Sequence, residues 1–226
     1  MKIQGAIFDL DGTLIDSMTW WETIWDVIGA AHFNGRPCRP DRATEERMHT
    51  LFVEESVKLL RDYYASELGV EIEYDALLET INRDIDDFYR TRVGLKAGVR
   101  TFLQTLYERK IPMCIASASE RESILTVLRV CGVDHYFSHI FTCSEVGKSK
   151  TSPDIYEAAL QTLGTPRDTT WVFEDAFTAL QTARSAGLRT VGIFEAQESR
   201  YEEMKRTANI YVDRGETLEK LIPMLE

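Results

Sequence analysis

The chain has 226 residues, of which 44% are hydrophobic and 28% charged, and its formal net charge is −11 at pH 7. This composition is that of an ordinary globular protein and excludes extensive disorder. The negative charge argues against a general nucleic-acid or membrane-surface binder, because both of those partners are polyanions. The length suits one large domain, or a core with one smaller domain.

The cysteine pattern and the hydropathy indicate the compartment. The four cysteines, Cys38, Cys114, Cys131 and Cys143, form no CxxC pair and no zinc-like spacing with histidine, so we expect free thiols in a reducing compartment. The sequence shows no signal-type segment, and no apolar run reaches membrane-spanning length. We therefore expect a soluble, cytoplasmic protein that is a monomer or weak homodimer and has no nucleic-acid or membrane partner.

An acidic segment follows the first apolar run of the chain. Residues 3–8 predict a buried strand, and Asp9 and Asp11 come directly after it. Side chains two apart on a strand project to the same side, so we expect the two carboxylates side by side. Two adjacent anions suggest a cation near them. An Asp-rich turn, made tight by Gly12, is the alternative that this segment alone leaves open.

The next part of the chain is helical in pattern. Apolar residues recur at spacings of three or four over 20–31, from 44 through Phe52 to Gly69, and over 74–89. Residues 32–42 contain Gly35, Pro37 and Pro40 and predict a loop. We expect residues 17–93 to form a small helical bundle inserted after the first strand.

Helices and strands then alternate to the end of the chain. We expect strands over 111–116, 140–143, 171–173, 190–194 and 210–212, and helices over 99–109, from Ser119 to near Gly132, from Ser152 to Gly164, and over 175–186. Ser119 with Glu122 has the spacing of a capping box, and Ser152-Pro153 that of an N-cap with an N1 proline. The alternation predicts an α/β fold, a Rossmann-like doubly wound parallel sheet formed by residues 1–16 and 94–226.

Polar residues stand where three further apolar runs stop. Ser117 and Ala118 end one run, and a hydroxyl beside the N–H groups that open a helix suits a phosphoryl oxygen. Lys150 lies shortly before the next helix, where its ammonium could balance a carboxylate and a phosphate. For each residue alone, a plain helix cap or a solvated side chain is the alternative.

The third of these strand ends carries Glu174 and Asp175. Two acids at the end of a buried strand are costly without a positive partner, and a hard divalent cation with oxygen ligands fits. Asp9 and Asp175, with a backbone carbonyl from Asp11, would suit Mg²⁺, which commonly keeps several waters. Asp175 as a helix cap is the alternative.

In order and in strand–helix context, these pieces resemble the motifs of the haloacid dehalogenase superfamily. The segment from Asp9 to Thr13 (DLDGT) resembles the first motif, Ser117 the second, Lys150 the third and Glu174-Asp175 the fourth. The helical insertion after the first motif resembles the helical cap found in one branch of the superfamily, that of small-molecule phosphatases and β-phosphoglucomutase-like proteins.

The resemblance implies a Mg²⁺-dependent phosphohydrolase acting on a small phosphorylated metabolite. It implies that Asp9 is the nucleophile that forms an aspartyl-phosphate, and that Asp11 is the general acid and base. By the same resemblance Ser117, Ala118 and Lys150 would bind the phosphoryl group.

The metal site is likewise an implication of the resemblance. Mg²⁺ would be held by Asp9, the Asp11 carbonyl and Asp175, with Glu174 shaping the metal shell.

The sequence leaves two other functions open. A β-phosphoglucomutase-like phosphomutase is the nearer alternative, but those enzymes carry a histidine five residues after the position of Asp16, where this chain has Trp21. A non-catalytic regulator that binds a phosphometabolite is disfavoured, because Asp9, Asp11 and Lys150 occur together with Asp175. Dehalogenases of the superfamily lack an acid at the position of Asp11.

Overall fold

The computed structural model describes residues 1–48, 51 and 53–226. The chain forms two compact units. One unit combines Met1–Asp16 with Gly94–Glu226, and the other is the intervening Ser17–Val93. The chain therefore leaves the first unit after its first strand and returns to it once.

The larger unit is built on one parallel sheet. Within the described residues the sheet has six strands in the order β3-β2-β1-β4-β5-β6. Their bounds are β1 Gly5–Phe8, β2 Met113–Ser117, β3 His139–Thr142, β4 Thr170–Glu174, β5 Arg189–Ile193 and β6 Ile210–Val212. Every paired neighbour runs parallel. The predicted α/β Rossmann-like fold class is confirmed.

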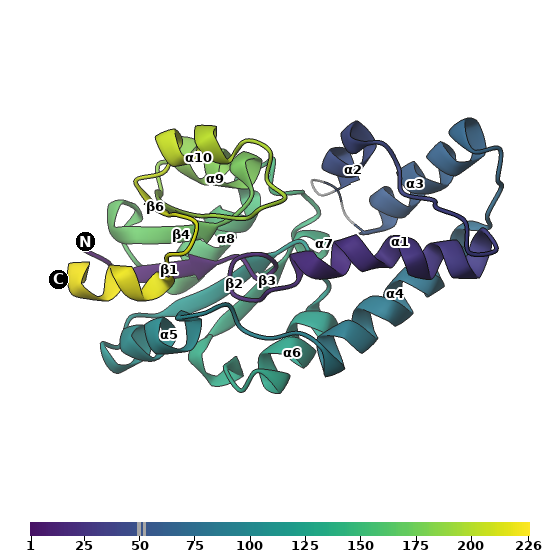
Figure 1. The fold of residues 1–226 in the computed structure, drawn as a ribbon. Helices are drawn as coiled ribbons and strands as arrows, with labels where there is room; N and C mark the ends of the chain where they lie inside the picture. Colours follow the sequence, from purple (N-terminus) through teal and green to yellow (C-terminus); the bar gives the residue numbers. More distant parts are fainter. Residues whose placement is uncertain (49–50, 52) are drawn as a thin grey trace. The chain divides into compact units, whose positions relative to one another are not determined.

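Helices cover both faces of this sheet (Figure 1). Helices α5 (Val99–Glu108) and α6 (Arg121–Val130) lie on one side. Helices α8 (Asp154–Leu163) and α9 (Phe177–Ser185) lie on the other, α8 against β1, β2 and β3 and α9 against β4 and β5. Buried aromatic rings fill the centre, where Phe8 stacks on Phe173 with ring centroids 4.4 Å apart.

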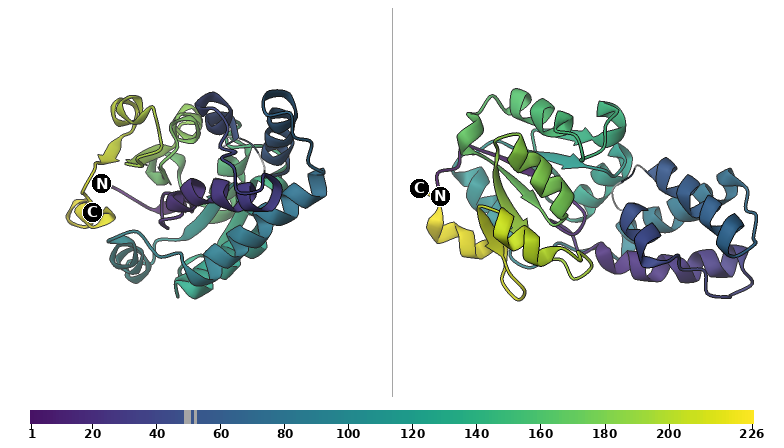
Figure 2. Two further views of the ribbon diagram at one scale, coloured as in Figure 1. Left: turned by 45° about the vertical axis from the view of Figure 1, so that its right-hand side comes forward. Right: turned by 90° about the horizontal axis from the view of Figure 1, so that it is seen from above.

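Shorter elements complete the unit. They are helices α7 (Cys143–Val146) and α10 (Tyr201–Thr207) and the 3₁₀ helices Asp134–Tyr136, Arg167–Thr169 and Leu218–Met224. The last of these brings the C-terminus beside the N-terminus (Figure 2), where the Met1 ammonium lies 3.0 Å from the Glu226 carboxylate. None of the described helices is long and apolar enough to cross a membrane. The four cysteines are free thiols.

The smaller unit is helical, as its periodicity predicts. Its helices are α1 (Met18–His32), α2 (Arg42–Met48), α3 (Val53–Glu67) and α4 (Tyr74–Thr91). Its core includes Trp20, whose indole N–H donates to Asp84 at 2.7 Å and so joins α1 to α4. The single helix expected from 44 to Gly69 is wrong, since α2 ends at Met48, where the Ser56 hydroxyl donates to the Met48 carbonyl. Phe52, part of that expectation, lies outside the described residues.

Three expected helix starts are also wrong, and a side-chain contact accompanies each of them. The Ser119 hydroxyl donates to the Asp11 carboxylate, so α6 begins at Arg121 without the predicted capping box. The Ser152 hydroxyl donates to Asp154, and α8 begins at that residue.

The third wrong start concerns the last long helix of the sheet unit. Helix α9 begins at Phe177, so Asp175 lies outside it and the cap alternative for this acid fails. The Phe177 N–H is instead capped by the Glu198 carboxylate at 2.8 Å. Residues 140–143 also differ slightly, because Cys143 begins α7 rather than ending β3.

Candidate active site

The candidate site lies where the strand order of the sheet reverses direction. Strand β1 pairs with β2 on one side and with β4 on the other, so the chain order runs outward both ways from it. In open α/β sheets ligands bind at the carboxyl ends of the strands at such a point. Here Asp9 follows β1, Ser117 ends β2, Glu174 ends β4 and Asp175 follows it.

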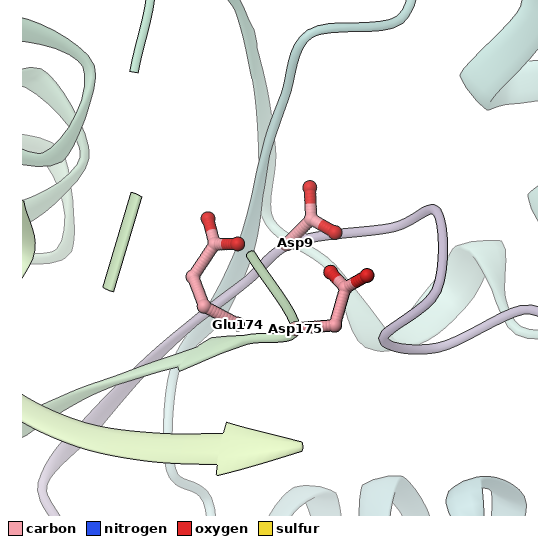
Figure 3. Close-up of side chains that lie close together, drawn as sticks. All are labelled: Asp9, Glu174 and Asp175. Carbon is pink, nitrogen blue, oxygen red and sulfur yellow. The ribbon is translucent and has the colours of Figure 1, made fainter. Parts of the chain in front are cut away.

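Three carboxylates gather at this edge (Figure 3). Asp9, Glu174 and Asp175 are all buried, and each offers an oxygen that lies within 4.8 Å of those of the other two. We call these three residues the acidic cluster. The backbone also joins the two strands that carry the acidic cluster, β1 and β4, because the Asp9 N–H donates to the Phe173 carbonyl at 3.0 Å.

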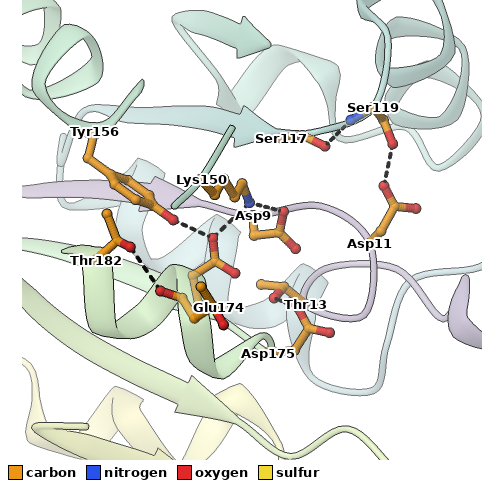
Figure 4. Close-up of polar contacts among 11 residues, drawn as sticks. Asp9, Asp11, Thr13, Ser117, Ser119, Lys150, Tyr156, Glu174, Asp175 and Thr182 are labelled. Carbon is orange, nitrogen blue, oxygen red and sulfur yellow. Dashed lines mark hydrogen bonds and ion pairs between the residues drawn. The ribbon is translucent and has the colours of Figure 1, made fainter. Parts of the chain in front are cut away.

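The ammonium of Lys150 lies against the acidic cluster (Figure 4). It donates to Asp9 Oδ1 and, at 2.7 Å, to Glu174 Oε1, with 13% of the lysine side chain exposed. The hydroxyl of Tyr156, from helix α8, donates to the same Glu174 oxygen at 2.8 Å. Four of the residues selected from the sequence, Asp9, Lys150, Glu174 and Asp175, are therefore in one constellation.

The charges of this constellation do not balance, because three carboxylates face one ammonium. Burial disfavours the charged form of Lys150, but Asp9 and Glu174 outweigh it and hold the lysine pKa above its ordinary value. Burial and the Asp9 charge raise the pKa of Glu174 to about 7, despite the opposing effect of Lys150. Burial, Asp9 and Glu174 raise the pKa of Asp175 well above its ordinary value. The site therefore does not carry three negative charges unless protons or a cation balance them.

A divalent cation fits this donor set. Glu174 Oε2 is buried, and among the described residues it has no hydrogen-bond partner. An orphaned carboxylate oxygen in a buried site costs free energy unless a cation or proton satisfies it. Two added positive charges would neutralise the three carboxylates and one ammonium, and hard cations prefer such oxygen ligands.

The raised acid pKa values predict a stability that depends on pH. Because Glu174 titrates near 7 in the folded chain and near 4.5 when unfolded, the folded state binds more protons between these values. The free energy of unfolding of the metal-free chain should therefore fall as pH rises from about 5 to about 8. Asp175 acts in the same direction.

Urea unfolding in a chelator at both ends of this range measures the effect. Glu174→Gln is the matched variant, because it keeps the side-chain shape and removes one titrating group. Its loss of stability over the range should be smaller than that of the wild type. Equal losses would contradict a proton held at Glu174.

Asp11 has a different environment from the acidic cluster. Its carboxylate accepts a hydrogen bond from the Ser119 hydroxyl at 2.7 Å and points toward the end of β2 (Figure 4). Asp9 belongs to the acidic cluster and Asp11 does not, so the two carboxylates are not the side-by-side pair that we expected. Ser117 is buried and its Oγ accepts the Ser119 N–H at 3.0 Å. A serine hydroxyl that accepts one bond still carries a hydrogen to donate. Ala118 is half-buried between these two serines.

The turn after β1 is held from several sides. Gly12 has a φ of 76°, a left-handed conformation that favours glycine, and its N–H donates to the Ile15 carbonyl at 3.0 Å. The Thr13 hydroxyl donates to Asp175 at 3.1 Å. Lys96 donates to the Gly12 carbonyl and, at 2.7 Å, to Glu195. These contacts fix the segment that carries both Asp9 and Asp11.

Several of these contacts have no clear signal in the sequence. Thr13 belongs to the first motif, which by itself gives its hydroxyl no separate role. Tyr156 occupies an apolar position of helix α8, a pattern that predicts core packing rather than a polar role. Lys96 and Glu195 lie 99 residues apart, and no local pattern joins them. Ser119 carried a signal, but the capping-box spacing pointed to a different partner.

Comparison with known proteins gives a consistent result. The model of a haloacid dehalogenase-like hydrolase family matches residues 3–187. A phosphorylated carbohydrates phosphatase of Thermotoga maritima is 21% identical, with 84% of each chain covered. An (S)-2-haloacid dehalogenase of Pseudomonas is 29% identical over 70% of this chain and 69% of its own.

Solved structures support the fold. CbbY of Rhodobacter sphaeroides, crystallised in complex with phosphate, superposes with a TM-score of 0.78 at 21% identity, covering 93% of this chain and 94% of that one. At 21% identity this similarity establishes the fold alone. The reaction has to be argued from the residues of the site.

Proposed function

Because this chain belongs to the haloacid dehalogenase-like hydrolase family, we propose that it is a Mg²⁺-dependent phosphatase of a small phosphorylated metabolite. The family match identifies an enzyme, and a named phosphatase among its relatives supports this class. The observation that carries the proposal is Lys150, held between Asp9 and Glu174 at the edge of the acidic cluster. A phosphate dianion needs positive charge to approach a carboxylate. The Lys150 ammonium lies beside the Asp9 carboxylate and would supply that charge.

Asp9 is the nucleophile in this proposal. Its carboxylate oxygen attacks phosphorus, an aspartyl-phosphate forms, and the bond from phosphorus to the leaving oxygen breaks. Lys150, the Ser117 hydroxyl and the backbone at Ala118 hold the phosphoryl oxygens. A Mg²⁺ ion held by Asp9, Asp175, Glu174 and the Asp11 carbonyl would supply charge neutralisation when bound.

Asp11 moves the protons. It donates its proton to the leaving oxygen in the first step and takes a proton from water in the second, as that water attacks the aspartyl-phosphate. The position of Asp11 supports this role, because its carboxylate lies outside the acidic cluster and contacts Ser119, which is itself bonded to the proposed phosphoryl ligand Ser117. The second step releases inorganic phosphate and regenerates Asp9.

The acid at position 11 also bears on the choice among reactions. One relative of this chain is an (S)-2-haloacid dehalogenase. Dehalogenases of the superfamily lack an acid at the position of Asp11, so its presence here supports phosphoryl transfer. Trp21, in place of the histidine of β-phosphoglucomutase-like proteins, favours water over a sugar hydroxyl as acceptor. We further propose that the helical unit Ser17–Val93 is the cap that selects the substrate.

A phosphometabolite screen that measures released phosphate tests the proposal. We expect release from a small set of sugar or other metabolite phosphates in Mg²⁺, and loss of that release in excess chelator. Activity that persists in the chelator would contradict the metal dependence. Formation of glucose 6-phosphate from β-glucose 1-phosphate faster than its hydrolysis would identify a phosphomutase instead.

A further inference from the structure

Tyr156 is a buried polar group for which the reaction above has no use. It lies in helix α8, which packs on β1, β2 and β3, and none of its side chain is exposed. Burial raises the pKa of Tyr156 well above its ordinary value, so the hydroxyl stays protonated and remains a donor. Among the described residues, Glu174 is its hydrogen-bond partner, at 2.8 Å.

The two oxygens of Glu174 have unequal surroundings. Oε1 accepts hydrogen bonds from Lys150 at 2.7 Å and from Tyr156 at 2.8 Å (Figure 4). Oε2 is buried and, within the described part of the chain, accepts none. Two donors on Oε1 fix the plane of the carboxylate and leave Oε2 as the oxygen available for a further partner.

The two donors differ in how many acceptors they have, because Tyr156 donates to Glu174 and Lys150 donates to both Glu174 and Asp9. The Lys150 ammonium is shared with Asp9, and a phosphoryl group that enters the site would compete for it. Without Tyr156, one shared lysine would set the orientation of a carboxylate that is 1% exposed.

We propose that Tyr156 is a positioning residue of the metal centre, whose hydroxyl holds Glu174 so that Oε2 binds the divalent cation. This inference rests on the metal site of the proposed function. Carboxylate ligands of metals are themselves hydrogen-bonded, and removal of such an outer partner typically weakens metal affinity about 10- to 100-fold.

Mn²⁺ binding followed by electron paramagnetic resonance tests this role without any substrate. Mn²⁺ favours the same oxygen ligands as Mg²⁺, and the signal of the free ion falls as it binds. Tyr156→Phe removes one oxygen atom and keeps the ring. Tyr211→Phe is the matched control, because the Tyr211 hydroxyl is buried and has no hydrogen-bond partner among the described residues. We expect the Kd for Mn²⁺ to rise about 10-fold or more in Tyr156→Phe and to stay unchanged in Tyr211→Phe.

The rise in Tm that saturating Mn²⁺ produces within each variant is the second measurement. It compares each protein with its own metal-free form, so a lower starting stability of Tyr156→Phe does not obscure the result. Equal affinity and equal Tm gain in Tyr156→Phe and wild type would overturn the role of Tyr156 alone. Absence of Mn²⁺ binding by the wild-type chain would overturn the metal site, and with it both proposals.

Discussion

Replacing Asp9 by Asn is expected to lower kcat for every phosphate ester by about 10⁴-fold or more, because the amide is a poor nucleophile at phosphorus. The amide has nearly the shape of the carboxylate and keeps an oxygen for the Lys150 ammonium. The loss should therefore appear in kcat while the fold is retained. It is measured as phosphate release in Mg²⁺ with saturating substrate.

Asp168→Asn is the matched control for this change. Asp168 is exposed and lies just before strand β4, at the end of the strand opposite to Glu174 and Asp175. The same chemical substitution there should leave kcat unaltered. An Asp9→Asn enzyme that turns over at the wild-type rate would contradict nucleophilic catalysis by Asp9.

Replacing Asp11 by Asn is expected to separate the two chemical steps. General acid and base catalysis contributes about 10²- to 10⁴-fold, and the amide supplies neither. An alkyl phosphate needs the proton from Asp11 to release its alcohol, so its first step should slow by about this factor. An aryl phosphate with a good leaving group needs no such help, and only hydrolysis of the aspartyl-phosphate should slow.

Comparison of pre-steady-state and steady-state rates on both ester types measures this separation. The wild-type and Asp11→Asn enzymes should differ little in the first turnover of para-nitrophenyl phosphate and strongly in later ones. Equal slowing of the first turnover for alkyl and aryl esters would contradict protonation of the leaving group by Asp11.

The fold and the gathering of the acidic cluster could be predicted because both follow from repeating local patterns. Alternating apolar strands and helices imply a parallel sheet, and the carboxyl ends of parallel strands share one edge. Residues that directly follow strands, such as Asp9 and Asp175, must then meet there. Their catalytic and metal-binding roles remain predictions.

The contacts that orient the site could not be predicted, since they join residues that are distant in sequence. Ser119 fits a local cap, but its hydroxyl bonds to Asp11, 108 residues away. Tyr156 fits an apolar helix face, and only the packing of α8 on the sheet brings its hydroxyl to Glu174. The spacing of residues along one helix or strand predicts that element alone. These hydrogen bonds depend on how different elements pack against one another.

Helix boundaries failed for a related reason. The Ser56 hydroxyl and the Leu51 N–H both donate to the Met48 carbonyl, so α2 ends inside a stretch whose apolar spacing continues. Helix α9 starts two residues later than expected, and the carboxylate of Glu198 from another segment caps it. In both places a side chain or backbone group outside the helix supplies the bond that decides where it ends or begins.

The aspartyl-phosphate is the central claim, and trapping it in the Asp11→Asn enzyme tests that claim most directly. After mixing with para-nitrophenyl phosphate and Mg²⁺, we predict a burst of one nitrophenol per enzyme, and acid quenching should leave a phosphoryl group on the peptide that contains Asp9. The same peptide from the Asp9→Asn enzyme should carry none. A wild-type enzyme that hydrolyses the ester, with neither burst nor phosphorylated peptide in Asp11→Asn, would contradict the account.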